Sequence, residues 1–556
     1  MNGRGGMLSG EFDYIIVGAG SAGCLLANRL SADADKRVLL LEAGGNDDYP
    51  WIHIPVGYLY CIGNPRTDWC YQTAAESGLG GRALGYPRGK VLGGSSSING
   101  MIYMRGQAAD YDHWEALGNP GWGWRDALPH FIAMEDHFDP ARPLHGHGGE
   151  WRVDKQRLSW EILDAFRAAA AEQGIAPVDD FNRGDNAGCG YFEVNQKNGR
   201  RWSSARAFLH PVRHRPNLTV LTGAEAESLV VERQRARAIS FLQQGQRLQA
   251  RCRGEIILAA GAIGSPLLLQ RSGIGPARLL AECGIAPRHI LPGVGANLQD
   301  HLQLRLVFQI AGAPTLNQRA ASWRGKLAMA WEYLWRRSGP MAMAPSQLGA
   351  FARSAPDVRW PDLEYHVQPL SLERFGQPLH PFPAFTASVC QLRPHSRGHV
   401  ELGGAPLDAP PLIQPNYLSH PEDQRVAAAA IRLTRRIAAS PALSRYLPAE
   451  YRPGLRYQTE DELVEAAGQI GTTIFHPVGT CKMGNDPLAV VDARLRVRGI
   501  AGLRVADASI MPTITSGNTN SPTLMIAAKA AQMIAQDNKQ PGAFATPATP
   551  AKETSA

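Results

Sequence analysis

The sequence lacks the patterns that mark a disulfide-rich protein, a zinc protein or a membrane-spanning protein. Its eight cysteines stand singly, without a CxxC pair or a Cys/His spacing that would suit a metal ion. No apolar run reaches the length of about 18 residues that a spanning helix needs, and no apolar segment follows the first residues. We therefore expect no metal site, no signal peptide and a reducing, cytoplasmic compartment.

The chain also lacks a strong charge of either sign. It has 57 Lys and Arg against 50 Asp and Glu, a formal net charge of +7, and no stretch in which aromatic and basic residues alternate. This pattern argues against a nucleic-acid partner. Hydrophobic residues make up 44% of the sequence, which is ample for large buried cores. At 556 residues the chain is too long for one simple core. Two domains, or one interleaved pair, are expected.

A glycine-rich turn follows the first apolar run, residues 13–17. The turn reads Gly-Ala-Gly-Ser-Ala-Gly over residues 18–23, and a helical pattern comes next at residues 24–30. Strand, GxGxxG and helix together are typical of a dinucleotide-binding unit, in which Gly18 makes the tight turn and Gly20 lets a pyrophosphate approach the backbone. The phosphates then lie on free N–H groups at a helix N-terminus.

Two further features support this interpretation. Gly23 allows the helix to pack closely on the strand, and a second strand at residues 37–41 ends in Glu42. A carboxylate at that point is expected to bind an adenosine ribose hydroxyl. The spacing predicts an adenine dinucleotide but does not distinguish NAD from FAD.

A second glycine-rich stretch covers residues 86–100. It contains the pair Gly93-Gly94, three serines at 95–97 and then Asn99. Backbone N–H groups, hydroxyls and an amide in so tight a loop can surround an anionic or carbonyl-rich group. We interpret the loop as part of the same binding site.

Four blocks in this order make the chain resemble the glucose-methanol-choline (GMC) family of oxidoreductases, nearest to its bacterial dehydrogenases of choline and primary alcohols. The blocks are residues 13–42, residues 89–99, residues 261–275, and residues 476–480 with 507–509 and 518–523. The resemblance implies an α/β fold in which a Rossmann-like FAD-binding domain is interleaved with a substrate domain, an antiparallel sheet covered by helices. It also implies FAD as the cofactor.

The order of the blocks predicts discontinuous domains. Residues 1–159, 201–311 and 464–537 are expected to form the FAD-binding domain, and residues 160–200 and 312–463 the substrate domain. Candidate strands of the substrate sheet are residues 363–367, 384–389 and 398–402. Residues 538–556, rich in Pro, Ala, Thr and Lys, are typical of a disordered tail.

The resemblance assigns the FAD contacts to the fingerprint, to the second glycine-rich loop, to one later strand and to the C-terminal block. They are Gly18, Gly20, Ser21, Ala22, Gly23, Glu42, Ala43, Arg88, Val91, Gly94, Ser95, Asn99, Gly100, Met101, Ile102, Ala226, Asp507, Ala508, Asn518 and Thr519. Some family members link FAD covalently through a histidine at the position of Ile98. An aliphatic side chain forms no such bond, so non-covalent FAD is expected.

Two residues of the C-terminal block are the expected catalytic pair. His476 stands in a constrained His-Pro-Val-Gly turn, and a neutral imidazole suits the removal of a hydroxyl proton. Asn520 falls where the family carries His or Asn, and its amide can hold the substrate oxygen; it can also act as a helix N-cap. His53, His366, His395 and His399 are interpreted as structural or surface residues.

The expected activity is the oxidation of a primary alcohol, aliphatic or aryl, to the aldehyde, with a quinone-type acceptor or O2. Many choline- and alkanol-type relatives carry Glu at the position that we align with Gln347. Without that carboxylate a quaternary ammonium lacks an ion-pair partner, which favours an uncharged alcohol. Met341, Met343 and Phe351 either line an apolar entrance or pack in the core. Choline oxidation remains an alternative, as do a hydroxynitrile lyase on the same scaffold and a flavin-binding protein without catalysis.

Residues 323–337 combine tryptophans and basic residues at helical spacing. Such a helix can lie in the interface of an anionic membrane, which would make the protein peripheral on an inner membrane. A helix packed over the substrate domain accounts for the same pattern and is the commoner arrangement.

Overall fold

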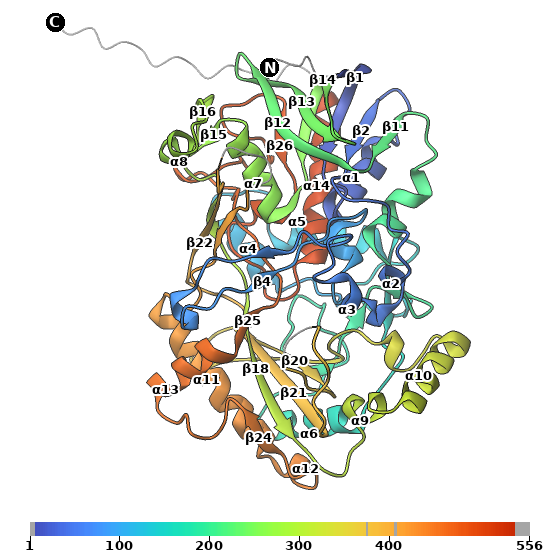
Figure 1. The fold of residues 1–556 in the computed structure, drawn as a ribbon, viewed down its shortest axis with the longest axis vertical. Coiled ribbons are helices and arrows are strands. Elements are labelled where there is room, and N and C mark those ends of the chain that lie inside the picture. The colour runs from blue at the N-terminus through green and yellow to red at the C-terminus, as the bar shows by residue number, and fades with distance from the viewer. Residues whose placement is uncertain (1–5, 374–375, 405–408, 540–556) are drawn as a thin grey trace, which may run out of the picture.

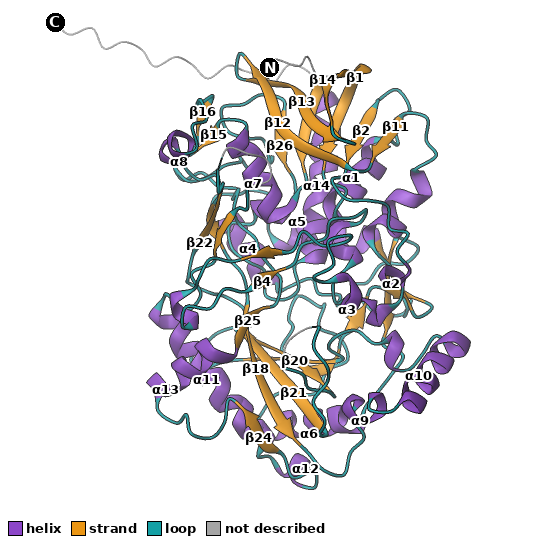
Figure 2. Ribbon diagram, in the orientation of Figure 1, coloured by secondary structure: helices purple, strands orange, loops and turns teal. Residues whose placement is uncertain are grey.

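A computed structural model of the chain describes residues 6–373, 376–404 and 409–539. Two large sheets lie toward opposite ends of the long axis, with helices between and around them (Figures 1 and 2). The predicted tail at 538–556 falls outside the described residues except for its first two positions, which end helix α14 (Asn520–Lys539). Among the described residues, no helix has both the length and the apolar character needed to cross a bilayer.

The first sheet has the strand order β11-β2-β1-β14-β13-β12, with β26 beside β14. Its strands are β1 (Gly6–Val17), β2 (Val38–Leu41), β11 (Leu218–Leu221), β12 (Ala224–Glu232), β13 (Arg235–Gln243), β14 (Gln246–Leu258) and β26 (Leu503–Val505). The pairs among β11, β2, β1, β14 and β26 are parallel, whereas β12, β13 and β14 form antiparallel hairpins. All four residues of β2 are buried, as expected for a parallel strand covered on both faces.

Helix α1 (Ser21–Leu30) leaves β1 through the glycine-rich turn and packs beside α14. Helix α5 (Trp124–Met134) packs against α14, and α4 (Ala108–Ala116) packs against α5, whereas α7 (Gly261–Arg271) packs against β12. The C-terminal helix and the first helix therefore share one core with the strands of the first sheet. This arrangement brings residues 18–23 and residues 518–520 together.

The second sheet is antiparallel throughout and has the order β24-β18-β21-β20-β19-β7, with β25 beside β18. Its strands are β7 (Gly188–Tyr191), β18 (Leu302–Gln309), β19 (Leu348–Ala352), β20 (Leu363–Gln368), β21 (Ala384–Gln391), β24 (Ala449–Arg452) and β25 (Gly471–Thr473). The strands predicted at 363–367 and 384–389 are β20 and β21. The third prediction, 398–402, was wrong about the sheet: β22 (Gly398–Glu401) pairs with β17 (Ala296–Leu298) and β23 (Leu412–Gln414) instead.

Three helices pack against strands of the second sheet: α6 (Glu161–Glu172), α11 (Pro421–Ala438) and α13 (Glu460–Ile470). Of the other helices in this half, α12 (Pro441–Ser444) packs on α6, and α9 (Leu316–Ala320) packs on α10 (Trp323–Arg336). The apolar face of α11, which includes Val426 and Ile431, is buried in a core shared with β18, β20 and β21. Antiparallel sheet and covering helices thus form the second half of a mixed α/β molecule.

The sheets divide the chain at points that differ from the expected boundaries. β18 and β25 lie in the second sheet, although residues 302–309 and 471–473 were assigned to the FAD-binding domain. The reason is strand pairing: β18 forms a long antiparallel ladder with β21, and β25 pairs with the other edge of β18. The division into two domains itself stays a prediction.

Candidate active site

A cavity of about 1240 Å³ lies between the two sheets. On one side it is lined by the ends of β1 and β2 and by the glycine-rich turn, and on the other by residues of β18 and β20. Its volume exceeds the few hundred to about 1,000 Å³ usual for a small-molecule site. The cavity can therefore hold a large cofactor together with a substrate.

Glycines set the shape of the turn at residues 18–23. Gly18 has φ +98°, a conformation that strains other residues, and a Cβ on Gly23 would lie 1.8 Å from the carbonyl oxygen of Gly18. A Cβ on Gly94 would lie 2.6 Å from Cα of Gly20, so the two glycine-rich loops touch. The N-terminus of α1 thus opens toward the cavity, ready to bind phosphate.

Glu42 lies at the end of β2, where the sequence predicted a ribose-binding carboxylate. It is buried, and its two oxygens accept hydrogen bonds from the backbone N–H of Ala19 and Gly44 at 2.9 and 2.8 Å. Burial raises the pKa of Glu42 to about 7, although these hydrogen bonds and the charge of Lys90 oppose the rise. The carboxylate is held rigidly at the cavity wall.

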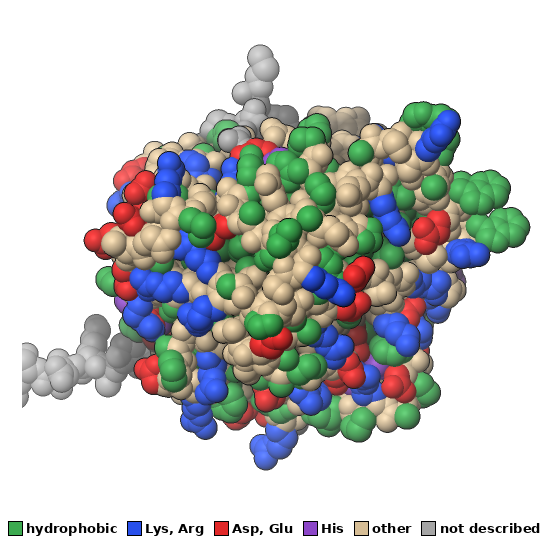
Figure 3. All heavy atoms as spheres, turned by 90° about the horizontal axis from the view of Figure 1, so that it is seen from below, with side chains coloured by type: hydrophobic (Ala, Val, Ile, Leu, Met, Phe, Trp, Pro, Cys, Tyr) green, Lys and Arg blue, Asp and Glu red, His purple; other side chains and the backbone are tan. Residues whose placement is uncertain are grey.

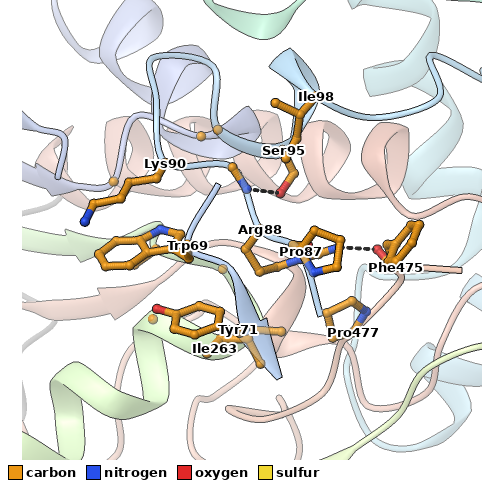
Figure 4. Close-up of a pocket in the computed structure, with 18 of the residues that line it drawn as sticks. Trp69, Tyr71, Pro87, Arg88, Lys90, Ser95, Ile98, Ile263, Phe475 and Pro477 are labelled. Carbon is orange, nitrogen blue, oxygen red and sulfur yellow. Dashed lines mark hydrogen bonds between the residues drawn. The ribbon is translucent and has the colours of Figure 1, made fainter. Parts of the chain in front are cut away.

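The second glycine-rich loop divides its serines between two tasks. Ser95 lines the cavity and accepts a hydrogen bond from the N–H of Gly89 at 3.2 Å (Figure 4). Ser96 and Ser97 instead donate to the carbonyl oxygens of Gly93 and Leu92 at 2.6 and 2.7 Å, closing the loop. Only one of the three hydroxyls faces the site.

Most residues expected to contact the cofactor line the cavity. They are Gly18, Gly20, Ser21, Ala22, Glu42, Ala43, Arg88, Gly94, Ser95, Asn99, Gly100, Met101, Ile102, Ala226, Asp507, Ala508, Asn518 and Thr519. Gly23 does not line it, because it lies in the contact between α1 and β1. Val91 does not line it either: its side chain is buried with Ile52, Cys61 and Ile98, because the loop turns it inward.

Asp507 ties three parts of the site together. Its Oδ2 accepts hydrogen bonds from the Ser265 hydroxyl at 2.6 Å and the Gly261 N–H at 2.8 Å, and its Oδ1 accepts from the Ser509 N–H at 2.8 Å. Burial raises its pKa. Asp507 thereby fixes the start of α7 against the segment that follows β26.

Sequence reasoning missed an aromatic wall of the cavity. Trp69 and Tyr71 stack with ring centroids 5.6 Å apart, and the ammonium group of Lys90 lies 4.2 Å from the centre of the Trp69 ring (Figure 4). Their only signal was two aromatic residues before the second glycine-rich stretch. Because they belong to no recognised motif, the contact became visible only in three dimensions.

His476 lies in a turn at the meeting point of the two halves. It is buried, and its backbone is held on the preceding side, where Arg88 donates to the carbonyl oxygen of Phe475 at 2.5 Å (Figure 4). Burial lowers the pKa of His476 well below its ordinary value, and the neighbouring His301, His366 and Arg88 lower it further. The imidazole is therefore neutral and able to accept a proton.

The hydrogen bonds around His476 define which nitrogen carries its proton. The amide Nδ2 of Asn518 donates to Nε2 of His476 at 3.0 Å, so Nε2 presents a lone pair. The proton of neutral His476 is then on Nδ1, which donates to Nδ1 of His301 at 3.1 Å. His301 in turn donates from Nε2 to the carbonyl oxygen of Leu392 at 3.1 Å. His301, which the sequence did not single out, fixes the tautomer.

Asp300 holds both histidines from behind. Its Oδ1 accepts hydrogen bonds from the backbone N–H groups of His301 and His476 at 2.9 and 2.8 Å. Its Oδ2 accepts from three hydroxyls, those of Tyr86, Tyr417 and Thr473, at 2.9, 2.5 and 2.6 Å. A buried carboxylate with five donors is fully satisfied, and it keeps the two imidazoles in register.

Asn520, the expected partner of His476, has a different contact. It is the first residue of α14, and its Oδ1 accepts a hydrogen bond from the Ser21 hydroxyl at 2.6 Å. Because Asn518 lies two residues earlier, before the helix begins, its side chain and not that of Asn520 reaches His476. The contacts of the two asparagines are thus the reverse of those expected: Asn520 contacts the glycine-rich turn, and Asn518 contacts His476.

The second sheet supplies the remaining wall. Gln303, Ser346, His366 and Gln368 line the cavity there. His366, expected to be structural or at the surface, is not at the surface: it is buried on β20 and lines the cavity. His395 is largely exposed, and His53 and His399 are half-buried.

Gln347 does not reach the cavity. Its side chain is buried, and its amide donates to the carbonyl oxygen of Ala344. Because Gln347 does not line the cavity, it does not contact a substrate there, contrary to the expected role in specificity. Met343 and Phe351 are buried in the core and do not line the cavity. Ser346, the residue before Gln347, lines the cavity instead.

The donor set fits a dinucleotide with a ring system at its end. A helix N-terminus opens to the cavity, and a carboxylate lies where a ribose would bind. Two polar atoms on the cavity wall, Asn518 Oδ1 and Asn520 Nδ2, have no hydrogen-bond partner within the described residues. Models of GMC oxidoreductases match residues 12–303 and 394–527. The chain belongs to the GMC oxidoreductase family.

Two curated relatives align with nearly the whole length of this GMC oxidoreductase. An alcohol dehydrogenase (acceptor) of Pseudomonas putida is 43% identical over 528 residues, 94% of this chain and 95% of the relative. An oxygen-dependent choline dehydrogenase of Vibrio vulnificus is 40% identical, over 96% and 95%. Among solved structures, pyridoxine 4-oxidase from Mesorbium loti has a TM-score of 0.87 at 33% identity and covers 95% of this chain and 99% of its own.

Membership of the GMC family confirms three predictions. The α/β fold class is correct, the protein is an oxidoreductase, and its cofactor is FAD. Ile98 lines the cavity with an aliphatic side chain, which is compatible with FAD that is not covalently bound. The roles of individual residues remain proposals.

Proposed function

We propose that this enzyme oxidises an uncharged primary alcohol, aliphatic or aryl, to the aldehyde. One observation carries the proposal: the lone pair of His476 Nε2 and the amide of Asn518 meet at 3.0 Å on the wall of the cavity, beside the residues that fit FAD. A base and a hydrogen-bond donor at one point are what an alcohol hydroxyl needs.

In this proposal the substrate hydroxyl displaces the direct hydrogen bond between the two side chains and binds to both of them. His476 accepts the hydroxyl proton at Nε2, because its Nδ1 already carries a proton that is held by His301. Asn518 donates from its amide to the substrate oxygen and stabilises the negative charge that develops there. Bound FAD supplies the acceptor for the hydride that leaves the carbon. We therefore assign the second catalytic role to Asn518 in place of Asn520.

The charge around the substrate end favours an uncharged alcohol over choline. The acidic residues that line the cavity, Glu42, Glu225, Glu227 and Asp507, all belong to the first half, on or beside the strands of the first sheet and helix α7. Within the described residues, the second sheet contributes Gln303, Ser346, His366 and Gln368 and no carboxylate. The carboxylate of Glu364 on β20 lies 3.2 Å from His366 but does not line the cavity, so a quaternary ammonium would leave water without a carboxylate in contact with it at this wall. The similarity to a choline dehydrogenase makes choline the competing substrate.

The electron acceptor is proposed to be a quinone or O2. One relative is named an alcohol dehydrogenase (acceptor), a name that does not specify the acceptor, and another an oxygen-dependent choline dehydrogenase. Mixing reduced enzyme with a soluble quinone or with air-saturated buffer, and following the return of flavin absorbance, distinguishes the two.

An anaerobic flavin-reduction screen tests the proposed substrate class. The enzyme is mixed without oxygen with a medium-chain alkanol, benzyl alcohol or choline, and bleaching of the flavin is followed. We expect faster bleaching by the uncharged alcohols. Faster bleaching by choline would overturn the specificity, and no bleaching by any alcohol, together with release of cyanide from a cyanohydrin, would point to the lyase.

A further inference from the structure

Helix α10 carries the most exposed group of large apolar side chains on the molecule. The exposed fractions are 68% for Trp323, 59% for Leu327, 69% for Trp331, 66% for Leu334 and 78% for Trp335. All five belong to one helix of 14 residues. Large side chains of this kind normally lie in a core or an interface. The exposure of five of them on one helix therefore needs an explanation.

The five side chains share one face of the helix. They follow one another at intervals of four, four, three and one residue, which keeps them on a single stripe. Trp331 and Trp335 stack with ring centroids 6.3 Å apart. Figure 3 shows hydrophobic side chains projecting from the edge of the molecule, on the side where α10 lies in Figure 1.

The opposite face attaches the helix to the body of the protein. Tyr333 is buried, and its hydroxyl donates to the carbonyl oxygen of Gly199 at 3.1 Å. Met329 packs against the core of the second sheet, and Ser322 caps the N-terminus by accepting from the N–H of Gly325. The helix is therefore packed over the second half of the molecule, as the commoner interpretation expected, and its apolar stripe still faces outward.

The charges around the stripe have one sign. Arg324, Lys326 and Arg336 are exposed, and Arg324 lies over the Trp323 ring at 5.5 Å. The single acid of the helix, Glu332, is half-buried and accepts a hydrogen bond from the Ser338 hydroxyl. Tryptophan and leucine beside arginine and lysine match a surface whose interior is apolar and whose headgroups are negative.

We propose that α10 binds an anionic lipid surface, lying in the headgroup region with its Trp/Leu stripe toward the acyl chains. Basic residues near such a surface are attracted to the headgroups, and an amphipathic helix enters it by several Å without crossing it. The chain then continues through a short 3-10 helix, Pro340–Ala342, to Pro345 and Ser346 on the cavity wall. The proposal does not rest on the proposed substrate or on catalysis.

Vesicle co-sedimentation of the FAD-loaded, full-length protein tests it. Vesicles of phosphatidylcholine with and without phosphatidylglycerol are compared at low and high salt. We expect binding to the anionic vesicles at low salt, and weakening as salt rises or phosphatidylglycerol is removed. Failure of the protein to bind anionic vesicles at low salt overturns the proposal.

Two sets of variants separate the stripe from its charges. Trp331→Ser with Trp335→Ser should abolish most binding, whereas Trp360→Ser, an exposed tryptophan elsewhere, should not. Arg324→Gln, Lys326→Gln and Arg336→Gln should each weaken binding about fivefold. Arg237→Gln and Arg251→Gln, two exposed arginines on β13 and β14, are the matched charge controls.

A protein partner is the competing occupant. Analytical ultracentrifugation of the parent and of the Trp331→Ser, Trp335→Ser double variant measures self-association without lipid. We expect the two to sediment alike. An oligomer of the parent that the double variant dissolves, or equal vesicle binding by parent and double variant, would contradict the lipid assignment.

Discussion

The reactivity of His476 depends on which of its two ring nitrogens carries the proton. Its Nε2 accepts from Asn518 and its Nδ1 donates to His301, which passes the constraint to the carbonyl oxygen of Leu392. Without this series of hydrogen bonds, a buried neutral imidazole could carry its proton on Nε2 and present a donor to the substrate. Burial thus keeps the ring neutral, and the hydrogen bond to His301 leaves the unprotonated Nε2 on the cavity side.

Replacing His301 tests this series of hydrogen bonds. His301→Ala removes the acceptor of the His476 Nδ1 proton and should slow anaerobic flavin reduction by at least about tenfold, because the proton is then no longer fixed on Nδ1 and can occupy Nε2. His301→Asn, which keeps an acceptor, should restore part of the rate. Stopped-flow absorbance measures both variants. Equal rates for His301→Ala and the parent would contradict the role.

Replacing the two asparagines in parallel distinguishes their roles. Asn518→Ala should lower the flavin-reduction rate constant about 100-fold, since a donor to the developing negative charge is lost. Asn520→Ala breaks only the contact with Ser21, so the FAD-loaded variant should reduce near the parent rate while holding FAD less tightly. Rate constants come from stopped-flow mixing and FAD affinity from fluorescence titration. The reverse pattern would restore Asn520 as the catalytic residue.

At the scale of elements, the contact of α1 with β1 positions the glycine-rich turn. Gly23→Ala puts a methyl group 1.8 Å from the Gly18 carbonyl oxygen, so helix and strand must separate. We expect lower thermal stability and loss of bound FAD, seen in the flavin-to-protein absorbance ratio. Gly45→Ala is the matched control, because Gly45 is exposed and a Cβ there meets nothing within 4 Å. A yellow, stable Gly23→Ala protein would contradict this account.

A buried ion network fixes β5 (Glu135–His137) against the loops around it. Glu135 accepts from Arg105 at 2.7 Å and lies 3.1 Å from His145, which lies 3.3 Å from Asp180. Burial alone would lower the pKa of His145, but hydrogen bonds to Asp180 and Glu135 raise it to about 9. For Glu135, burial is outweighed by His145 and Arg105, which lower its pKa to about 2.

These shifts predict how the free energy of unfolding depends on pH. Because the pKa of folded His145 lies above its ordinary value of 6.5, the stability it adds is complete below pH 6.5 and is lost as pH rises through about 9. The loss should be on the order of 2 kcal/mol. Urea unfolding at both ends of this range measures it. His145→Gln should remove this part of the pH dependence, and an unchanged slope in the variant would contradict the assignment.

The glycine-rich turn and several buried strands could be predicted from the sequence because their signals are local. The turn at 18–23, the acid at 42 and the strands β20 and β21 each follow from short patterns of glycine and apolar residues. Membership of a sheet is not local. β22 has the same alternation as β20, and only its pairing with β17 and β23 excludes it from the second sheet.

For the whole molecule, the site depends on contacts between distant parts of the chain. His476, Asn518 and His301 lie far apart in sequence, and no spacing rule connects them. The motif therefore predicted His476 but not His301, and it could not decide between two asparagines two positions apart, whose side chains separate where α14 begins. His366 was missed because a lone histidine on a buried strand looks the same whether it faces a core or a cavity.

Anaerobic stopped-flow reduction of His476→Ala tests the central claim most directly. The variant should bind FAD and remain yellow, because His476 holds none of the glycine-rich turn, yet a primary alcohol should bleach it at least about 100-fold more slowly than the parent. Bleaching of the FAD-loaded variant at the parent rate would contradict the assignment of His476 as the base.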